Sequence, residues 1–468
     1  MGRWTVVVGA LLVQVCLGAI YAWGTFVPMF KATRPELALM MRPEVLGISA
    51  PVYEGWSSRA KELKRTLADA RGTARDEAKA AWSGFLKEKV EPGLEVPEAT
   101  WGTYQAGYSG IQTMSVFSTC LMVFSLVMIV SGRWQDRVGP RRVALLGCAL
   151  LGVSYLMASL AVTNFWWVVG WIGVVGGAGI GCAYVCPIAA CLKWYPDAKG
   201  TITGLAVAGF GAGAYVFIHL AGSWGGLLAK GGVPLTFRTF GLIFLCVGCA
   251  GAMLLRNPPG WEAGPAALKG DGPDLEQGES VRTGTFWLLW TSFMLSSGSG
   301  LMVINNLKDF GVREGGMSEA NAEQALALLA LFNGLGRVVW GTLGQKFGPS
   351  RAAVALMLLQ AGMLVSLPGL GGSVGLLALG ACWVGFQFGG NLSLFPLMTA
   401  EQFGLRHLGG NYGLVFTGYG LGGVLGPILA GSVWDALHSY DRAFWAASGA
   451  SVLAAILVSR VRRGVVPA

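Results

Sequence analysis

Long unbroken apolar runs constrain the fold of this chain more than any other feature of its sequence. A helix needs about 20 mostly apolar residues to cross the hydrocarbon core of a bilayer. Runs of this kind lie at 4–28, 106–130, 143–163, 165–192, 201–226, 237–255, 284–307, 322–343, 351–369, 372–398, 411–433 and 443–460. Only 13% of the 468 residues are charged, whereas about a quarter are charged in an average soluble domain, and transmembrane barrels have short alternating segments instead. We therefore predict an all-α membrane protein with twelve transmembrane helices.

The distribution of Lys and Arg predicts how these helices are oriented, because short cytoplasmic loops carry an excess of positive charge. With the N-terminus inside, 16 Lys and Arg residues fall in cytoplasmic segments and 5 fall in the short outer segments. We expect a multi-pass protein of the plasma or inner membrane, with both termini cytoplasmic. The net charge of +9 then reflects the excess of Lys and Arg in the cytoplasmic segments, and no nucleic-acid partner is expected.

Two polar segments interrupt the apolar pattern. Residues 256–283 are rich in Pro and Gly, which is typical of a flexible cytoplasmic linker. Residues 31–105 form a longer insert on the outer side, and its middle part, 57–90, alternates charged and apolar residues at the spacing of one or two amphipathic helices. The insert has twelve basic and eleven acidic residues, so we expect a cap with a structural or partner-binding role rather than an electrostatic trap.

An internal repeat at a single offset of 209 residues divides the chain into halves. Residues 132–142 (GRWQDRVGPRR) recur as 341–351 (GTLGQKFGPSR). The same offset relates Gly181 to Gly390, Pro187 to Pro396, Gly204 to Gly413, Gly209 to Gly418 and Gly211 to Gly420. We predict a six-helix half at 1–255, which includes the insert, and a second six-helix half at 284–468, with 256–283 as the linker. Two parallel halves around a site at the bilayer midplane are an architecture of secondary transporters.

Segment 132–142 resembles the signature loop of the major facilitator superfamily, and the resemblance covers nearly the whole chain outside the insert. Four shorter motifs resemble a narrower group, the oxalate:formate antiporter family, which is related to the animal monocarboxylate transporters. They are 18–26 (GAIYAWGTF), 257–261 (NPPGW), 333–337 (NGLGR) and 410–413 (GNYG). The resemblance implies twelve helices in the major facilitator fold and transport of a small carboxylate.

Arg337 is the strongest single candidate for a functional residue. It lies well inside the run 322–343, where an ionised side chain costs at least a few kcal/mol unless it faces a cavity or a partner. The acid on the same run, Glu323, is fourteen residues away, so the planar guanidinium is available to bind both oxygens of a carboxylate. At the repeat offset the first half has Met128, so the site is chemically one-sided.

Asn333 lies one turn before Arg337 and shares its helix face. It is a candidate to contact the substrate, and the alternative is a hydrogen bond to another helix, which Asn commonly makes in membranes. The monocarboxylate transporters that this motif resembles carry Asp there, and an amide cannot hold a proton as Asp could.

Five aromatic residues are further candidates, because the resemblance implies that aromatic side chains of the corresponding helices enclose the carboxylate. They are Tyr21, Tyr184, Trp383, Phe416 and Tyr419. Tyr184 and Tyr419 are favoured, since mid-span hydroxyl groups require polar partners. The oxalate carriers place a lysine three residues after an aromatic in the eleventh helix, whereas here Tyr419 follows Phe416 at that spacing. One cation would leave one charge of a dianion unmatched, so we expect a monoanion.

A conformational latch is predicted on the cytoplasmic side. Its residues are Asp136, Arg137, Arg141 and Arg142. An acid near the N-terminus of a helix in the other half gains from the helix dipole, and the arginines are expected to pair with acids across the interface. Gln345 stands where the repeat would place a second acid, so the latch is expected on one side only.

Together these features predict a secondary active transporter of a small monocarboxylate anion, such as lactate, pyruvate, formate or acetate, which works by alternating access. The coupled species is left open between a proton and a counter-anion. One alternative is an oxalate:formate-type antiporter, and another, suggested by the insert alone, is a non-transporting sensor or complex subunit. No nucleophile–base set indicates an enzyme, and His219, His407 and His438 are too scattered for a metal site. We expect a monomer in the lipid bilayer without a cofactor.

Overall fold

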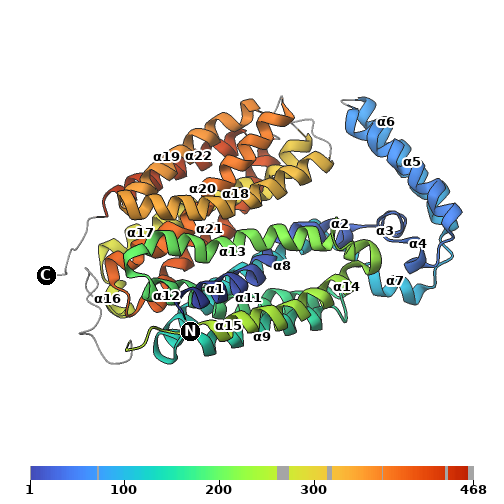
Figure 1. Ribbon diagram of the computed structural model, residues 1–468. Coiled ribbons are helices and arrows are strands. Elements are labelled where there is room, and N and C mark those ends of the chain that lie inside the picture. Colours follow the sequence, from blue (N-terminus) through green and yellow to red (C-terminus); the bar gives the residue numbers. More distant parts are fainter. Residues whose placement is uncertain are drawn as a thin grey trace.

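The computed structural model describes residues 2–70, 73–260, 274–313, 319–370, 373–437 and 441–461. Within these ranges the chain is mostly helical and contains no strand. The helices form two bundles that lie side by side, one from each half of the chain (Figure 1). The apolar runs that the sequence predicted to be transmembrane helices are mostly helical, which confirms the predicted all-α fold.

The membrane segments of the first half are often built from several helical pieces. They are α1 (Arg3–Leu17) with η1 (Gly18–Ala22) and α2 (Trp23–Lys31); α8 (Gly110–Val138); α9 (Pro140–Ala158); α10 (Phe165–Val168) with η4 (Val169–Gly176), α11 (Gly177–Ala183) and α12 (Val185–Trp194); α13 (Lys199–Ala221), preceded by η5 (Pro196–Ala198); and α14 (Leu227–Ile243) with η6 (Phe244–Gly248) and α15 (Cys249–Leu254).

The helices of the second half are longer and more regular. They are α17 (Gly284–Arg313), α18 (Glu319–Phe347), α19 (Pro349–Ser366) with η8 (Leu367–Leu370), α20 (Val374–Phe403), α21 (Leu408–Leu437) and α22 (Asp441–Ser459). Among the described residues, 11 helical segments are long and apolar enough to cross a membrane by length and composition. The remaining expected segment is α21, a continuous helix of 30 residues. The protein is therefore a multi-pass membrane protein.

The signature segment 132–142 is mostly helix rather than loop. α8 and α9 are joined by the single residue Gly139, whose φ is +86°, and α18 and α19 are joined in the same way by Gly348, whose φ is +90°. Glycine adopts positive φ without a steric penalty, and proline fits the first turn of the helix that follows. The repeated Gly-Pro pair therefore sets the same helix boundary in both halves.

The two halves contact each other closely along two helix pairs, α8 with α21 and α13 with α18. Gly132 packs against Gly409, and Gly200 packs against Gly341, so closely that a Cβ on Gly132 or Gly200 would lie 2.1 Å from the carbonyl oxygen opposite. The repeat offset of 209 relates one contact to the other. We call this end of the molecule the terminal end, because α1 begins there, with Trp4 packed against Tyr195, four residues before the start of α13, at a ring-centroid distance of 6.0 Å.

Part of the expected linker is docked on the second half. The short helix α16 (Gln277–Ser280) lies at the start of α21, where Nε2 of Gln277 donates to the carbonyl oxygen of Gly410 (2.6 Å) and Nδ2 of Asn411 donates to the carbonyl oxygen of Leu275 (2.8 Å). These bonds hold residues 274–283 in place, whereas a flexible linker was expected throughout. The rest of the expected linker includes residues 261–273, which lie outside the described part of the chain.

The insert is a small helical unit at the opposite end, which we call the insert end. It comprises α3 (Arg34–Met40), α4 (Pro43–Leu46), α5 (Ala50–Asp69), α6 (Thr73–Phe85), η2 (Leu86–Val90), η3 (Glu91–Gly93) and α7 (Glu98–Tyr104). α5 and α6 form a hairpin that projects away from the two bundles (Figure 1), in agreement with the amphipathic pattern at 57–90.

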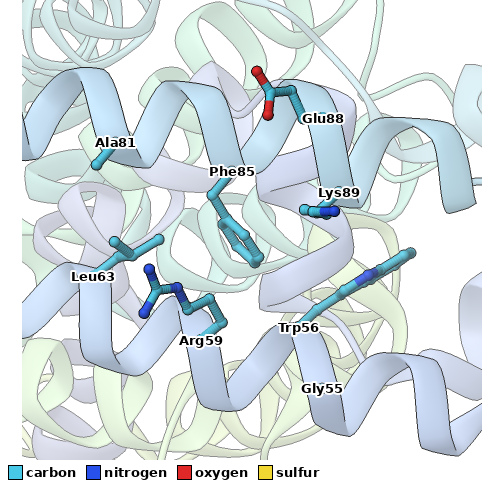
Figure 2. Close-up of a pocket in the computed structure, with 8 residues that line it drawn as sticks. All are labelled: Gly55, Trp56, Arg59, Leu63, Ala81, Phe85, Glu88 and Lys89. Atoms are coloured by element: carbon cyan, nitrogen blue, oxygen red, sulfur yellow. The ribbon is translucent and has the colours of Figure 1, made fainter.

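The hairpin is anchored at its base and has an open groove between its helices. Val90 is fully buried, and Trp56 packs against Gly93. Figure 2 shows the groove, which has a volume of ≈ 480 Å³ and is lined by apolar residues such as Leu63 and Phe85 and by charged residues at its rim. The groove belongs to the insert alone, so the insert has its own surface separate from the membrane core.

We predict that Gly200→Ala opens the contact between the halves at the terminal end. The new Cβ would overlap the carbonyl oxygen of Gly341. Overpacking of this kind costs about 1–3 kcal/mol, which corresponds to a fall of about 5–150-fold in the population of the closed arrangement. Hydrogen exchange followed by mass spectrometry should therefore rise in α13 and α18 at this end. Gly362→Ala is the matched control, because a Cβ there has nothing within 4 Å; equal exchange in the two variants would contradict the prediction.

Candidate functional site

Arg337 lies on α18 where this helix packs against α13 of the other half, and its side chain is fully buried. Nε donates a hydrogen bond to Oδ1 of Asn333 one turn earlier (2.9 Å), and one terminal nitrogen donates to the backbone carbonyl oxygen of Val207 on α13 (2.8 Å). Cζ lies 5.2 Å from the centre of the Phe210 ring. The other terminal nitrogen is buried and forms no hydrogen bond of ordinary geometry among the described residues; the Tyr184 hydroxyl lies beside the guanidinium, and an anion bound there would meet both groups.

Among the side chains that the structure describes, no carboxylate forms an ion pair with Arg337. The buried charged side chains among them are Arg337 and Lys193. An unbalanced cation in a membrane core is costly unless an anion or a water-filled cavity faces it. Over the same residues, no group of three or more His, Cys, Asp or Glu side chains could hold a metal ion, and His438 lies outside them. The electrostatics therefore suit an organic or inorganic anion.

Four of the five predicted aromatic residues lie together beside Arg337. They are Tyr21, Tyr184, Phe416 and Tyr419. The Phe210 ring that faces the guanidinium has Tyr21 at 5.3 Å and Tyr184 at 5.4 Å between ring centroids. Phe416 continues the cluster, 5.3 Å from Tyr184 and stacked on Tyr419 at 4.6 Å. The predicted aromatic enclosure is thus formed by rings from both halves.

Tyrosine hydroxyl groups supply the polar atoms of this enclosure. The hydroxyl groups of Tyr21 and Tyr419 form a direct hydrogen bond across the interface between the halves. The hydroxyl of Tyr184 lies next to the side chains of Arg337 and Tyr412. Polar groups that can orient a bound anion are therefore held within a mostly apolar, water-excluding surround.

Trp383 does not belong to the cluster, which corrects the prediction made for it. Its side chain is 38% exposed on the outside of α20, and its Nε1 donates to the carbonyl oxygen of Leu359 on α19 (3.4 Å). An aromatic residue in a membrane helix faces lipid as readily as a cavity, and α20 is apolar on most of its faces. The sequence therefore could not show on which side Trp383 lies.

Sequence reasoning missed several aromatic residues of the enclosure, among them Phe210 and Phe124. Phe210 covers the guanidinium, and the ring of Phe124 lies 5.1 Å from that of Tyr184. The repeat held a signal for both, since an offset of 209 relates Phe210 to Tyr419 and Phe124 to Asn333. A search of the first half at the counterparts of the candidate residues would have found them.

Comparison with known proteins places this arrangement in a family. The sequence profile described as Major Facilitator Superfamily matches residues 96–393 and 307–467, which together span most of the chain. The chain belongs to the Major Facilitator Superfamily. The solved structure of the human organic anion transporter MFSD10 has the same fold, with a TM-score of 0.64 at 16% identity and with coverage of 98% of this chain and 100% of that one.

Two sequence relatives match the group that the motifs indicated. The chain is 28% identical over 475 residues to apicoplast pyruvate carrier 1 of Toxoplasma gondii, with 88% of this chain and 81% of that protein covered. It is 27% identical over 306 residues to the oxalate:formate antiporter of Oxalobacter formigenes, with 64% of this chain and 71% of that protein covered. The resemblance to the oxalate:formate antiporter within the Major Facilitator Superfamily is confirmed.

The terminal end of this Major Facilitator Superfamily protein is latched at both helix pairs. Asp136 at the end of α8 accepts hydrogen bonds from the backbone N–H of Gly410 (2.9 Å) and Gly409 (3.3 Å), at a helix N-terminus that favours a negative charge. Gln345 on α18 takes the corresponding place for α13, where its Oε1 accepts from the backbone N–H of Thr201 (3.2 Å). The latch was predicted on one side only, but the structure has an ionic contact and a neutral one.

The three predicted arginines do not take part in these latch contacts. Arg137, Arg141 and Arg142 are exposed, and none of them forms an ion pair within the described residues. Instead, the buried ammonium group of Lys193 acts electrostatically on Asp136. The sequence did not reveal this lysine, because it lies on α12, outside the signature segment.

We predict that Asp136→Asn weakens the latch, whereas Arg141→Gln leaves it unchanged. The amide keeps an acceptor oxygen but loses the charge that the helix N-terminus stabilises, so the contact should weaken by about 0.3–1 kcal/mol or more. Hydrogen exchange at the start of α21 should rise in Asp136→Asn. If Arg141→Gln raises exchange by the same amount, the exposed arginines belong to the latch after all.

Proposed function

We propose that this protein is a secondary active transporter of a small monocarboxylate anion of the lactate, pyruvate, formate and acetate class. The observation that carries the proposal is the buried guanidinium of Arg337, which has one nitrogen without a hydrogen bond of ordinary geometry and forms no ion pair with a carboxylate in the described chain. A carboxylate at this position would accept charge-assisted hydrogen bonds and neutralise the cation. Asn333, Tyr184 and Tyr419 would orient the anion, and the surrounding rings would exclude water.

The comparisons support a carboxylate as the transported group. One relative is a pyruvate carrier by name, and another is an oxalate:formate antiporter by name. Both names describe transport of small organic acids, and the residues beside Arg337 give this chain a physical basis for binding the same functional group.

The valence of the substrate follows from the number of cations. Arg337 is the buried cation of the enclosure, and Tyr419 stands on α21 where a lysine would be needed to match a second negative charge. A dianion would therefore enter the enclosure with one charge unbalanced, which is unfavourable in a low-dielectric surround. We propose that the substrate carries a single negative charge.

Alternating access would use the contacts that join the halves at the terminal end and in the layer of Arg337. The bond of Arg337 to Val207, the bond of Tyr21 to Tyr419 and the latch at Asp136 all cross the interface, so they must break when this end opens. We place the terminal end in the cytoplasm and the insert outside the plasma or inner membrane, because that orientation puts the excess of Lys and Arg inside.

Anion exchange of the oxalate:formate type is the second candidate. A proton symporter needs a group that takes up a proton together with the substrate, and none of the fully buried side chains that the structure describes is a carboxylate, while the half-buried Asp136 is bonded in the latch. Asn333 offers an amide instead. In an exchanger, a second anion binds to the site before the halves return to their first orientation. A proton gradient would then not drive uptake.

We predict that Arg337→Gln and Arg337→Lys both lose monocarboxylate binding while the protein still inserts into the membrane. Gln removes the charge, and Lys keeps the charge but loses the planar fork that binds two oxygens. Uptake and counterflow of labelled lactate in proteoliposomes would measure the effect, with Arg351→Gln as the control, since Arg351 is exposed on α19. Lactate transport at the wild-type level by Arg337→Gln would refute the proposed site, and a wild-type protein that moves no carboxylate at all would favour a sensor or complex subunit.

We predict that oxalate competes with labelled lactate less well than unlabelled lactate does in the wild type, and that Tyr419→Lys improves the competition by oxalate. The new ammonium would match the second negative charge of the dianion. Tyr419→Phe separates the effect of the new charge from the loss of the hydroxyl. If wild-type protein binds oxalate more tightly than lactate or formate, the argument from valence fails and the antiporter candidate replaces the monocarboxylate carrier.

A further inference from the structure

A group of polar side chains inside the second half has no hydrogen-bond partner, and the proposed binding of the carboxylate does not use it. The group lies on α17 and α20 and consists of Ser296, Ser297, Gln387 and Asn391. Each of these residues is at most 2% exposed, and each has a side-chain oxygen or nitrogen without a partner among the described residues. Buried polar atoms are nearly always paired in folded proteins, so a cluster of unpaired atoms indicates that something else binds there.

Two packing contacts fix how α17 and α20 face each other. The rings of Phe293 and Phe395 stack at 4.0 Å with an interplanar angle of 12°. Gly300 packs against the Phe388 ring, where a Cβ on the glycine would lie 2.5 Å from Cδ2. Seven residues separate the members of these contacts on each helix, and they follow one another in opposite order, so the helices are antiparallel.

This register places Ser297 opposite Asn391. Ser297 comes four residues after Phe293, and Asn391 comes four residues before Phe395, so each lies one helical turn from the aromatic stack on the same face. The pair lies between the stack and the contact of Gly300. It is therefore enclosed by aromatic rings on both sides along the helix axes.

The pair lies at the depth of Arg337. On α20, a Cβ on Gly389 would lie 2.0 Å from the carbonyl oxygen of Asn333, and Oγ of Ser393 donates to the carbonyl oxygen of Arg337 (2.9 Å). Asn391 is two residues from each of these contacts, which is about 3 Å along a helix axis. The polar pair and the guanidinium therefore lie in one layer of the bundle.

Tyr419 connects the polar pair with the proposed carboxylate site. Its ring lies 5.6 Å from that of Phe293 and 6.3 Å from that of Phe388, the two rings that flank the pair on either side. Its hydroxyl contacts Tyr21, which packs on the ring that covers Arg337. Tyr419 therefore lies between the rings that flank the polar pair and the rings that cover Arg337.

We propose that Ser297 and Asn391 form a neutral subsite that binds an uncharged oxygen substituent of the substrate. The preferred substrates are then hydroxy- and oxo-monocarboxylates, such as lactate and pyruvate, rather than formate or acetate. The amide and the hydroxyl offer both donors and acceptors, which suits a hydroxyl or keto oxygen, and neither residue carries a charge that would balance a second carboxylate. This inference rests on the proposed function, with the carboxylate bound at Arg337.

Lactate and propionate test the subsite, because they differ by one hydroxyl group. A site built to bond a hydroxyl discriminates against the analogue that lacks it, since its own polar groups are then left unpaired. Full-length protein in proteoliposomes should bind lactate about 10-fold more tightly than propionate, which is the effect of one or two neutral hydrogen bonds. Competition of each acid against labelled pyruvate gives the two affinities.

Asn391→Leu and Ser297→Ala should bring the two affinities close to each other by weakening lactate while propionate binding is retained. The melting temperature of Asn391→Leu should not fall, because the variant removes a buried polar group that has no protein partner. Ser299→Ala is the matched control on α17, since Oγ of Ser299 is bonded to Oγ of Ser451 on α22 (2.8 Å), and it should keep the wild-type ratio.

Three results would overturn the subsite. They are a wild-type protein that binds propionate as tightly as lactate, an unchanged ratio in both Asn391→Leu and Ser297→Ala, and the same loss of discrimination in Ser299→Ala. Failure of the proposed function looks different, because no monocarboxylate would then compete in any variant, or Arg337→Gln would bind as the wild type does.

Discussion

The arrangement of this protein depends on how one positive charge is accommodated inside the membrane. Arg337 is fully buried, and three of the groups that solvate it are the amide of Asn333 on its own helix, and the ring of Phe210 and the backbone carbonyl of Val207 on the other half. Two of these three groups belong to the first half, so the charge is best solvated while α13 and α18 are packed together. The side chain proposed to bind substrate therefore also stabilises one arrangement of the halves, and a bound anion changes the energy of that arrangement directly.

Around this charge the halves are copies of each other in backbone and differ in chemistry. The glycine contact at Gly132 recurs at Gly341, and each lets two helices of different halves approach until their backbones touch. α18 has Arg337 at the position that corresponds to Met128 on α8. In the same way, the neutral latch contact of Gln345 on α18 corresponds to the ionic latch contact of Asp136 on α8. A duplicated scaffold thus joins the halves by equivalent contacts, while substitutions on it put the proposed anion site on one side only.

The sequence predicted those features that follow from local physical rules. Apolar runs located the helices, and a charge inside such a run identified Arg337, because both signals depend on the membrane and not on packing. The residues that were misplaced or missed are those whose direction depends on which helix is next to them. Trp383 faces outward, Arg141 and its neighbours face solvent, and Lys193 lies beside the latch from another helix. Ser297 and Asn391 resemble ordinary packing residues until the register of α17 and α20 is known.

The bond from Arg337 to Val207 uses a main-chain oxygen, and this affects how the contact can evolve. Every amino acid at position 207 presents the same carbonyl oxygen, so mutations there preserve the bond as long as the new side chain packs. Position 207 can drift without a compensating change at position 337. Aligned homologous sequences should therefore show no covariation between positions 207 and 337, even though this contact joins the halves. The bond between Tyr21 and Tyr419 links two side chains, so positions 21 and 419 should covary.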